Sequence, residues 1–119
     1  MSAYSGALEA VERILNRGGD ADDLLRQVVA VLHERVDGYS WVGIAFVEGA
    51  ALVAGPSSGK AQAEVSGVPI SYDGKQVAEL RVATDEVTPD DRAFLERVAL
   101  LISPYCLVGW DTGGEAWSP

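Results

Sequence analysis

The sequence has few residues of the kinds that bind metals or form disulfides. Its 119 residues include one cysteine, Cys106, and one histidine, His33. Zinc and iron sites use three or four such ligands at short spacing, so we expect no metal site and no cofactor. Cys106 has no second cysteine to pair with, and the sequence does not open with a basic and then apolar leader. Both features favour a reducing, cytoplasmic setting.

Basic residues and long apolar runs are also scarce. Lys and Arg number 9 against 18 Asp and Glu, which gives a formal net charge of −9, and no basic run occurs. This charge repels phosphate backbones and anionic lipids, so we expect no nucleic-acid binding and no membrane binding. No apolar run approaches the roughly 20 residues that span a bilayer. Hydrophobic residues make up 48% of the sequence, which is enough for one domain with its own core.

The first third of the sequence predicts two helices. Apolar residues fall on one side of a helical wheel over residues 7–17, and this helix is expected to end at Gly18-Gly19. Asp20 is a suitable N-cap for a second helix that extends to about residue 37. Its wider apolar arc predicts burial against two neighbours. His33 lies at the margin of that arc and is expected to be a partly exposed surface residue.

The middle of the sequence predicts two hairpins. We expect four strands, over residues 39–47, 51–54, 64–72 and 75–84. The first is apolar on both alternating faces, which is typical of a central strand covered from both sides. Residues 55–63 are rich in Gly, Ser and Pro and predict a loop. The dipeptide Asp73-Gly74 predicts a type I′ turn, in which both residues need a positive φ.

The last part of the sequence predicts a closing helix. Thr88-Pro89-Asp90-Asp91 supplies an N-cap, a proline at the first position and two acids in the first turn, which we interpret as capping, solvated carboxylates. Pro104 should end or kink this helix. The order helix, helix, hairpin, loop, hairpin, helix predicts an α+β fold with an antiparallel sheet and its helices on one face. Glu79 and Arg81 alternate with apolar residues in the last strand, so the other face is expected to be polar or wet.

Several of these segments together resemble a GAF domain. They are the two leading helices, the strand that begins Trp41-Val42-Gly43, Val68-Pro69-Ile70 before a hairpin, and Thr88-Pro89-Asp90-Asp91 before the closing helix. The resemblance covers residues 1–109, implies a GAF/profilin-like fold and leaves residues 110–119 as a C-terminal tail. A profilin-like or roadblock-like interaction domain is an architectural alternative.

Two local motifs are similar to those of free methionine-(R)-sulfoxide reductases. They are the strand Trp41-Val42-Gly43-Ile44-Ala45-Phe46 and the later Gly55-Pro56-Ser57-Ser58-Gly59-Lys60. Those reductases carry their thiols in helices and loops between the two hairpins, and that segment is reduced here to residues 57–64, without cysteine. Cys106 instead lies in or after the last helix, on its apolar side, as expected for a structural thiol. Because sulfoxide reduction needs a thiolate, we expect no enzymatic activity.

The reductases' substrate-binding residues are also largely replaced. The two aspartates of the family's last strand align with Arg81 and Ala83, and its glutamate aligns with Val65. Trp41 is kept, but the tyrosine four residues later aligns with Ala45. The short segment between the hairpins further implies that the lid helices, which cover the second sheet face in GAF domains, are missing. We expect either the C-terminal tail or a partner to cover that face.

The closing helix carries a second apolar pattern outside its core stripe. Ala93, Leu100 and Leu107 recur every seven residues, which suits a helix-to-helix seam. The GAF resemblance implies pairing through the first and last helices, so the predicted homodimer interface is Leu8, Ala93, Leu100 and Leu107. The alternative is that Leu100 and Leu107 are ordinary contacts with the first helix.

Three functions remain as hypotheses. The first is a catalytically inert, minimal GAF-like interaction or regulatory module of a bacterial type, in signalling, with a homodimeric assembly. The second is a sensor that binds a small molecule on the sheet face, at the candidate residues Trp41, Tyr72, Glu79 and Arg81. The third is an enzyme of the methionine sulfoxide reductase type that uses Cys106.

Overall fold

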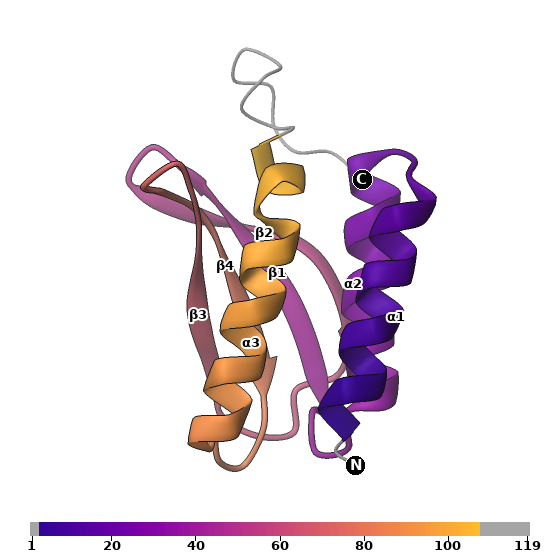
Figure 1. Ribbon diagram of the computed structural model, residues 1–119. Helices are drawn as coiled ribbons and strands as arrows, with labels where there is room; N and C mark the ends of the chain where they lie inside the picture. The colour runs from indigo at the N-terminus through magenta and orange to yellow at the C-terminus, as the bar shows by residue number, and fades with distance from the viewer. Residues whose placement is uncertain (1–2, 108–119) are drawn as a thin grey trace.

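A computed structural model describes residues 3–107 of the chain, which form a layer of helices on an antiparallel sheet (Figure 1). The elements in chain order are α1 (Ala3–Arg17), α2 (Ala21–Arg35), β1 (Trp41–Glu48), β2 (Ala51–Gly59), β3 (Val65–Tyr72), β4 (Lys75–Ala83), α3 (Pro89–Ile102) and the 3-10 helix η1 (Ser103–Leu107). The predicted tail, residues 110–119, lies outside the described residues. Within the described chain, no helix is both long and apolar enough to cross a membrane.

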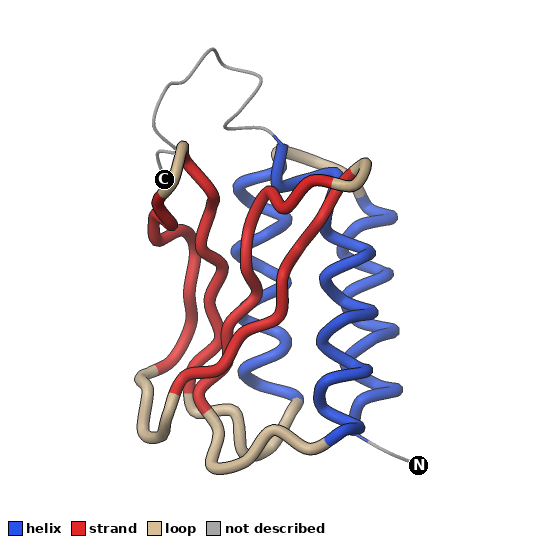
Figure 2. Tube along the Cα trace, turned by 90° about the vertical axis from the view of Figure 1, so that its left-hand side faces the viewer, coloured by secondary structure: helices blue, strands red, loops and turns tan. Residues whose placement is uncertain are grey.

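The four strands are arranged in the order β2-β1-β4-β3, and each neighbouring pair is antiparallel. All three α-helices lie on the same face of this sheet (Figure 2). The connection from β2 to β3 is residues 60–64 and contains no helix, so it adds no cover to the other face. We call that other face the open face. The predicted α+β class, with helices gathered on one face, is confirmed.

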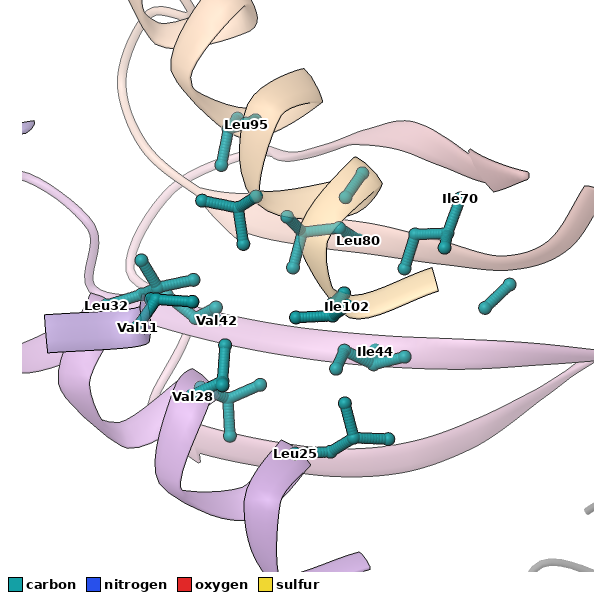
Figure 3. Close-up of a cluster of buried hydrophobic side chains, with 14 of the residues drawn as sticks. Val11, Leu25, Val28, Leu32, Val42, Ile44, Ile70, Leu80, Leu95 and Ile102 are labelled. Carbon is teal, nitrogen blue, oxygen red and sulfur yellow. The ribbon is translucent and has the colours of Figure 1, made fainter. Parts of the chain in front are cut away.

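The core fills the space between the sheet and the helices. α2 packs on β1 and β2, α3 packs mainly on β3, and α1 lies against both α2 and α3. Ten of the central side chains are labelled in Figure 3: Val11, Leu25, Val28, Leu32, Val42, Ile44, Ile70, Leu80, Leu95 and Ile102. All ten are almost fully buried, and the four strand residues among them point toward the helices because side chains alternate between the two faces of a strand.

The helix ends largely agree with the sequence signals. α1 ends at Arg17, before Gly18 with its φ of 77°, but begins earlier than expected. Asp20 has the extended N-cap conformation, yet its side chain makes no capping hydrogen bond. Thr88 caps α3 as predicted, in a capping box with Asp91. The α-helix ends at Ile102, and the chain passes Pro104 in the 3-10 geometry of η1.

The two hairpins differ in how well their sequence predicts them. Asp73 and Gly74 both have positive φ, 55° and 80°, which confirms the predicted turn between β3 and β4. The prediction that the second strand ends at residue 54 is wrong, because β2 continues to Gly59. The pairing of β1 with β2 shifts register opposite Ile44, where Gly55 and Pro56 form a bulge. Proline is tolerated there because β2 is an edge strand.

Candidate functional site

The open face is where the sequence predicts a ligand, and the strand register decides which side chains reach it. Trp41 lies opposite Ala83, Gly43 opposite Arg81, and Ala45 opposite Glu79. These β1 residues alternate with core residues, so they and their β4 partners point away from the helices. The structure therefore brings three of the four predicted ligand residues, Trp41, Glu79 and Arg81, onto one part of the open face.

Trp41 lies across its own strand. A Cβ added to Gly43 would come within 2.4 Å of the Trp41 ring, so the indole occupies the space that a side chain at position 43 would need. Gly43 is the β1 residue opposite Arg81. The indole of the half-buried Trp41 thus covers the sheet beside the row of residues that carries Arg81.

Arg81 and Glu79 form an ion pair along β4. The Arg81 Nε donates a hydrogen bond of 2.5 Å to Glu79 Oε1, and the two side chains are 34% and 27% exposed. Glu79 also packs over Gly67 of β3, where an added Cβ would lie 2.9 Å from its carboxyl carbon. The acid and the base are therefore held against the sheet as a mutually neutralising pair, and an ionic ligand would compete with that pair.

Tyr72 is separated from these residues. It lies at the end of β3, opposite Lys75 of the hairpin, and its side chain is 42% exposed. Side chains two residues apart in a strand point to the same face, so Tyr72 falls on the face of Val68 and Ile70, which are in the core. The structure thus does not bring Tyr72 to Trp41, and the grouping expected from sequence is incomplete. Sequence alternation could have shown this, because Tyr72 is an even number of residues from Ile70.

The described elements provide only one wall for a ligand on the open face. Apolar side chains remain exposed at both of its edges, among them Leu52 on β2 at 41% and Val65 on β3 at 46%. A small-molecule site normally encloses most of the ligand. Within residues 3–107, the short β2–β3 connection leaves the face flat rather than enclosed.

Cys106 is buried in η1, on the helix side of the sheet. Its side chain is 0% exposed, and burial raises the pKa of the thiol to about 12. A thiol with that pKa is protonated at neutral pH and is a poor nucleophile. In the described part of the chain, no group of three or more His, Cys, Asp and Glu residues could hold a metal ion.

Asp91 is the centre of a buried polar cluster that the sequence did not predict. One carboxylate oxygen accepts hydrogen bonds from the hydroxyls of Tyr4, at 2.5 Å, and Tyr39, at 2.9 Å. The other accepts from the backbone N–H and the hydroxyl of Thr88, both at 3.0 Å. Asp91 is only 6% exposed, so the expectation of a solvated carboxylate is wrong for this residue, although its capping role is confirmed. Asp90, its neighbour, is exposed as expected.

These hydrogen bonds determine the ionisation of the cluster. Burial acts to raise the pKa of Asp91, but the hydrogen bonds from Tyr4, Thr88 and Tyr39 stabilise the carboxylate more, and the net pKa lies below its usual value. Burial, and then the Asp91 carboxylate, raise the pKa of Tyr39. The cluster is therefore an anion with neutral donors, suited to holding elements together.

The predicted dimer residues lie on the outer surface of the helix layer. Leu100 is 63% exposed and Ala93 is exposed, while Leu8 is partly buried against the core. The alternative that Leu100 is an ordinary contact with α1 is therefore wrong. Leu107 is the last residue of η1, and its side chain lies outside the described residues.

His33 is half-buried, as the sequence predicts for a partly exposed residue. Its Nδ1 lies 3.3 Å from the Ser58 hydroxyl, at the edge strand β2. Its ring also packs on Gly59, where an added Cβ would lie 2.6 Å from Nε2. These contacts explain the residue as packing between α2 and β2.

Comparison with known proteins gives a fold but no sequence relative. No protein-family model matches the chain, and no curated protein matches it. A GAF sensor protein from Burkholderia vietnamiensis superposes with a TM-score of 0.74 at 15% identity, over 95% of this chain and 97% of that one. The GAF domain of an Acinetobacter phosphoenolpyruvate-protein phosphotransferase gives 0.73 at 14% identity, over 92% and 98%.

The chain has the GAF fold. A free methionine-(R)-sulfoxide reductase from Staphylococcus aureus, solved with its substrate, is similar to this GAF-fold chain as well. Its TM-score is 0.73 at 17% identity, over 87% of this chain and 95% of the reductase. The two resemblances stated from sequence are thus confirmed as likenesses of fold. At these identities they do not carry substrates or activities to this chain.

Proposed function

We propose that this GAF-fold chain is a catalytically inert interaction or regulatory module that acts as a homodimer in the bacterial cytoplasm. The observation that carries the proposal is Leu100, a large apolar side chain that is 63% exposed on α3. Single exposed apolar residues are common on monomers, but Leu100 shares the exposed face of α3 with Ala93, seven residues before it.

Further apolar side chains lie along α1 and the end of the closing helical segment, partly buried against the core, and we call the outer surface of α1 and α3 the α1–α3 seam. They are Tyr4, Leu8 and Leu15 from α1, Leu101 from α3 and Tyr105 from η1. The Tyr4 ring stacks on Phe94 of α3 with centroids 4.9 Å apart, which fixes the two helices side by side. A second copy placed on this seam would remove Leu100 and the half-exposed side chains from water together.

Two features support the absence of catalysis. The one cysteine of the sequence, Cys106, is buried, and its pKa is raised to about 12. The charged residues on the open face, Glu79 and Arg81, are paired with each other. A thiol reductase needs an accessible thiolate, and general acid–base catalysis needs a group free to exchange a proton with substrate.

The test is the oligomeric mass of Leu100→Glu. We expect the wild type to sediment as a dimer and Leu100→Glu as a monomer with an unchanged thermal midpoint, because an exposed charge on the seam opposes burial without touching the core. Ser71→Glu, an exposed position on β3 with the same change of charge, is the matched control and should remain a dimer. A monomeric wild type at tens of micromolar would remove the homodimer.

The sensor is a second candidate function, favoured by the juxtaposition of Trp41, Glu79 and Arg81 on the open face. Native mass spectrometry of gently purified protein should then show a reproducible adduct that Arg81→Ala loses. A clean protein mass in both variants, with no quenching of Trp41 fluorescence by a metabolite mixture, would reject this function and leave the interaction module.

A further inference from the structure

A groove runs between α1 and α2 on the outside of the helix layer. Its volume is about 670 Å³. Its small and apolar lining residues are Ala10, Ile14, Ala30 and Val31. The groove lies on the flank of α1 that faces α2, whereas the α1–α3 seam lies on the flank that carries Tyr4 and Leu8. The two surfaces are therefore separate, and the groove can be occupied whether or not the proposed dimer forms.

The charge of this groove is opposite to that of the molecule. The whole chain has twice as many acidic as basic residues, 18 against 9. The groove, in contrast, is lined by three arginines, Arg13, Arg17 and Arg35, and by one acid, Glu34. One third of all basic residues of the sequence thus converge on one groove of an acidic protein.

The three arginines have no carboxylate partner within residues 3–107. The ion pairs of the described chain involve Arg26, Arg81 and Arg92 instead. Arg17 Nη2 donates a hydrogen bond of 3.1 Å to Gln27 Oε1 across the groove, a neutral acceptor that leaves its charge uncompensated. In a chain with surplus acids, three exposed arginines without ion pairs beside an apolar floor favour an acidic occupant with apolar side chains.

We propose that the occupant is this chain's own C-terminal segment, residues 108–119. This segment carries two acids, Asp111 and Glu115, and two tryptophans, Trp110 and Trp117. The carboxylates would pair with the arginines, and the indoles would cover the apolar floor and stack on guanidinium groups. Its composition is complementary to the groove in both charge and hydrophobicity.

The connection permits this docking. The segment comes directly after η1, which contacts α2, one of the two walls of the groove. Twelve residues extend to at most about 40 Å, and the tether holds them at an effective concentration in the millimolar range. Contacts between exposed charges are individually weak, but a tethered segment needs only weak contacts to remain bound most of the time.

The test uses indole N–H signals in ¹⁵N NMR spectra of the full chain, assigned with Trp110→Phe and Trp117→Phe. In the wild type, the two tail indoles should be shifted from random-coil positions and exchange slowly with water. In the triple variant Arg13→Glu/Arg17→Glu/Arg35→Glu, they should move to random-coil positions and exchange at least tenfold faster. Lys75→Glu/Arg92→Glu/Arg97→Glu changes the net charge equally, away from the groove, and should leave both signals unchanged.

Three results would overturn the proposal. Random-coil indole signals in the wild type would mean that the segment does not dock. Release by the open-face variant Leu52→Lys/Val65→Lys, but not by reversal of the groove arginines, would place the segment on the sheet. Signals that revert to random coil on dilution would mean that a second copy supplies the segment.

Discussion

At the scale of single residues, Asp91 connects three parts of the fold through one carboxylate. It caps α3, and it accepts hydrogen bonds from Tyr4 of α1 and from Tyr39, just before β1. The sequence predicted the capping role, because Thr88-Pro89-Asp90-Asp91 is a local signal. It did not predict the burial, because Tyr4 and Tyr39 are 87 and 52 residues away, and no local pattern encodes such contacts.

Asp91→Asn should destabilise the protein by about 2–3 kcal/mol, because two tyrosine hydroxyls and Thr88 lose a charged acceptor that is buried. Urea unfolding of the variant measures this loss. The control is Asp90→Asn, an exposed acid in the same helical turn, which should change stability by less than about 0.5 kcal/mol. Equal effects of the two substitutions would mean that the dipole of α3, rather than the buried cluster, accounts for the stability.

The stability lost in Asp91→Asn should depend on pH. The pKa of Asp91 is lowered in the folded state, so its contribution to stability is complete above its unfolded pKa, about 4. It is lost as pH falls through the lower folded pKa. The difference in unfolding free energy between wild type and Asp91→Asn should therefore be constant from pH 5 to 7 and shrink toward pH 2. A difference that grows on acidification would contradict the ionised state of this carboxylate.

Gly43 is the residue on which the position of Trp41 depends. Gly43→Ala should push the indole off the sheet, because the new Cβ would lie 2.4 Å from the ring. We expect a loss of about 1–3 kcal/mol from overpacking, with a red shift of Trp41 emission in a background where Trp110 and Trp117 are phenylalanine. If emission and stability both stayed unchanged, the indole would not lie over Gly43.

At the scale of elements, local signals predicted helices and turns better than the edge strand. Asp73-Gly74 is a strong signal because only certain residues accept its φ angles, and the turn is as expected. Residues 55–59 have loop composition, yet they pair with β1 as part of β2. Pairing there is imposed by the neighbouring strand, and a bulge accommodates Pro56. Composition could not show this, because the decisive partner is β1, not the segment itself.

Alanine should have opposite effects on stability at two glycines, Gly74 in the turn between β3 and β4 and Gly6 in α1. Gly74→Ala should destabilise by about 1 kcal/mol, because its φ of 80° disfavours a side chain. Gly6→Ala should stabilise by about 0.5–1 kcal/mol, because Gly6 lies within α1 and an added Cβ meets no atom within 4 Å. Thermal melts of both variants show whether each substitution lowers or raises the stability. Destabilisation by Gly6→Ala would mean that α1 does not extend through residue 6.

At the scale of the whole molecule, the sequence predicted the layered architecture, because the order of elements allows few arrangements. It predicted only part of the candidate site. The pairing of β1 with β4 brings Trp41, Glu79 and Arg81 together on the open face. Tyr72 instead lies at the hairpin end of β3, on the face that the helices cover. The α1–α2 groove has no local signal, because its arginines lie on two helices and only the packing of those helices brings them together. The net charge of −9 predicts an acidic protein, but a net charge cannot show that three arginines line one groove.

Net charge gives the dimer and the docked segment opposite responses to salt. Two copies that each carry −9 repel across the apolar α1–α3 seam. Salt screens this repulsion, since the Debye length falls from about 30 Å at 0.01 M to about 8 Å at 0.15 M. We expect the dimer dissociation constant, measured by sedimentation equilibrium, to fall several-fold over that range. The indole shifts should instead move toward random coil, because acid–arginine pairs are screened. A dimer that salt weakens would have charge pairs, not Leu100, at its interface.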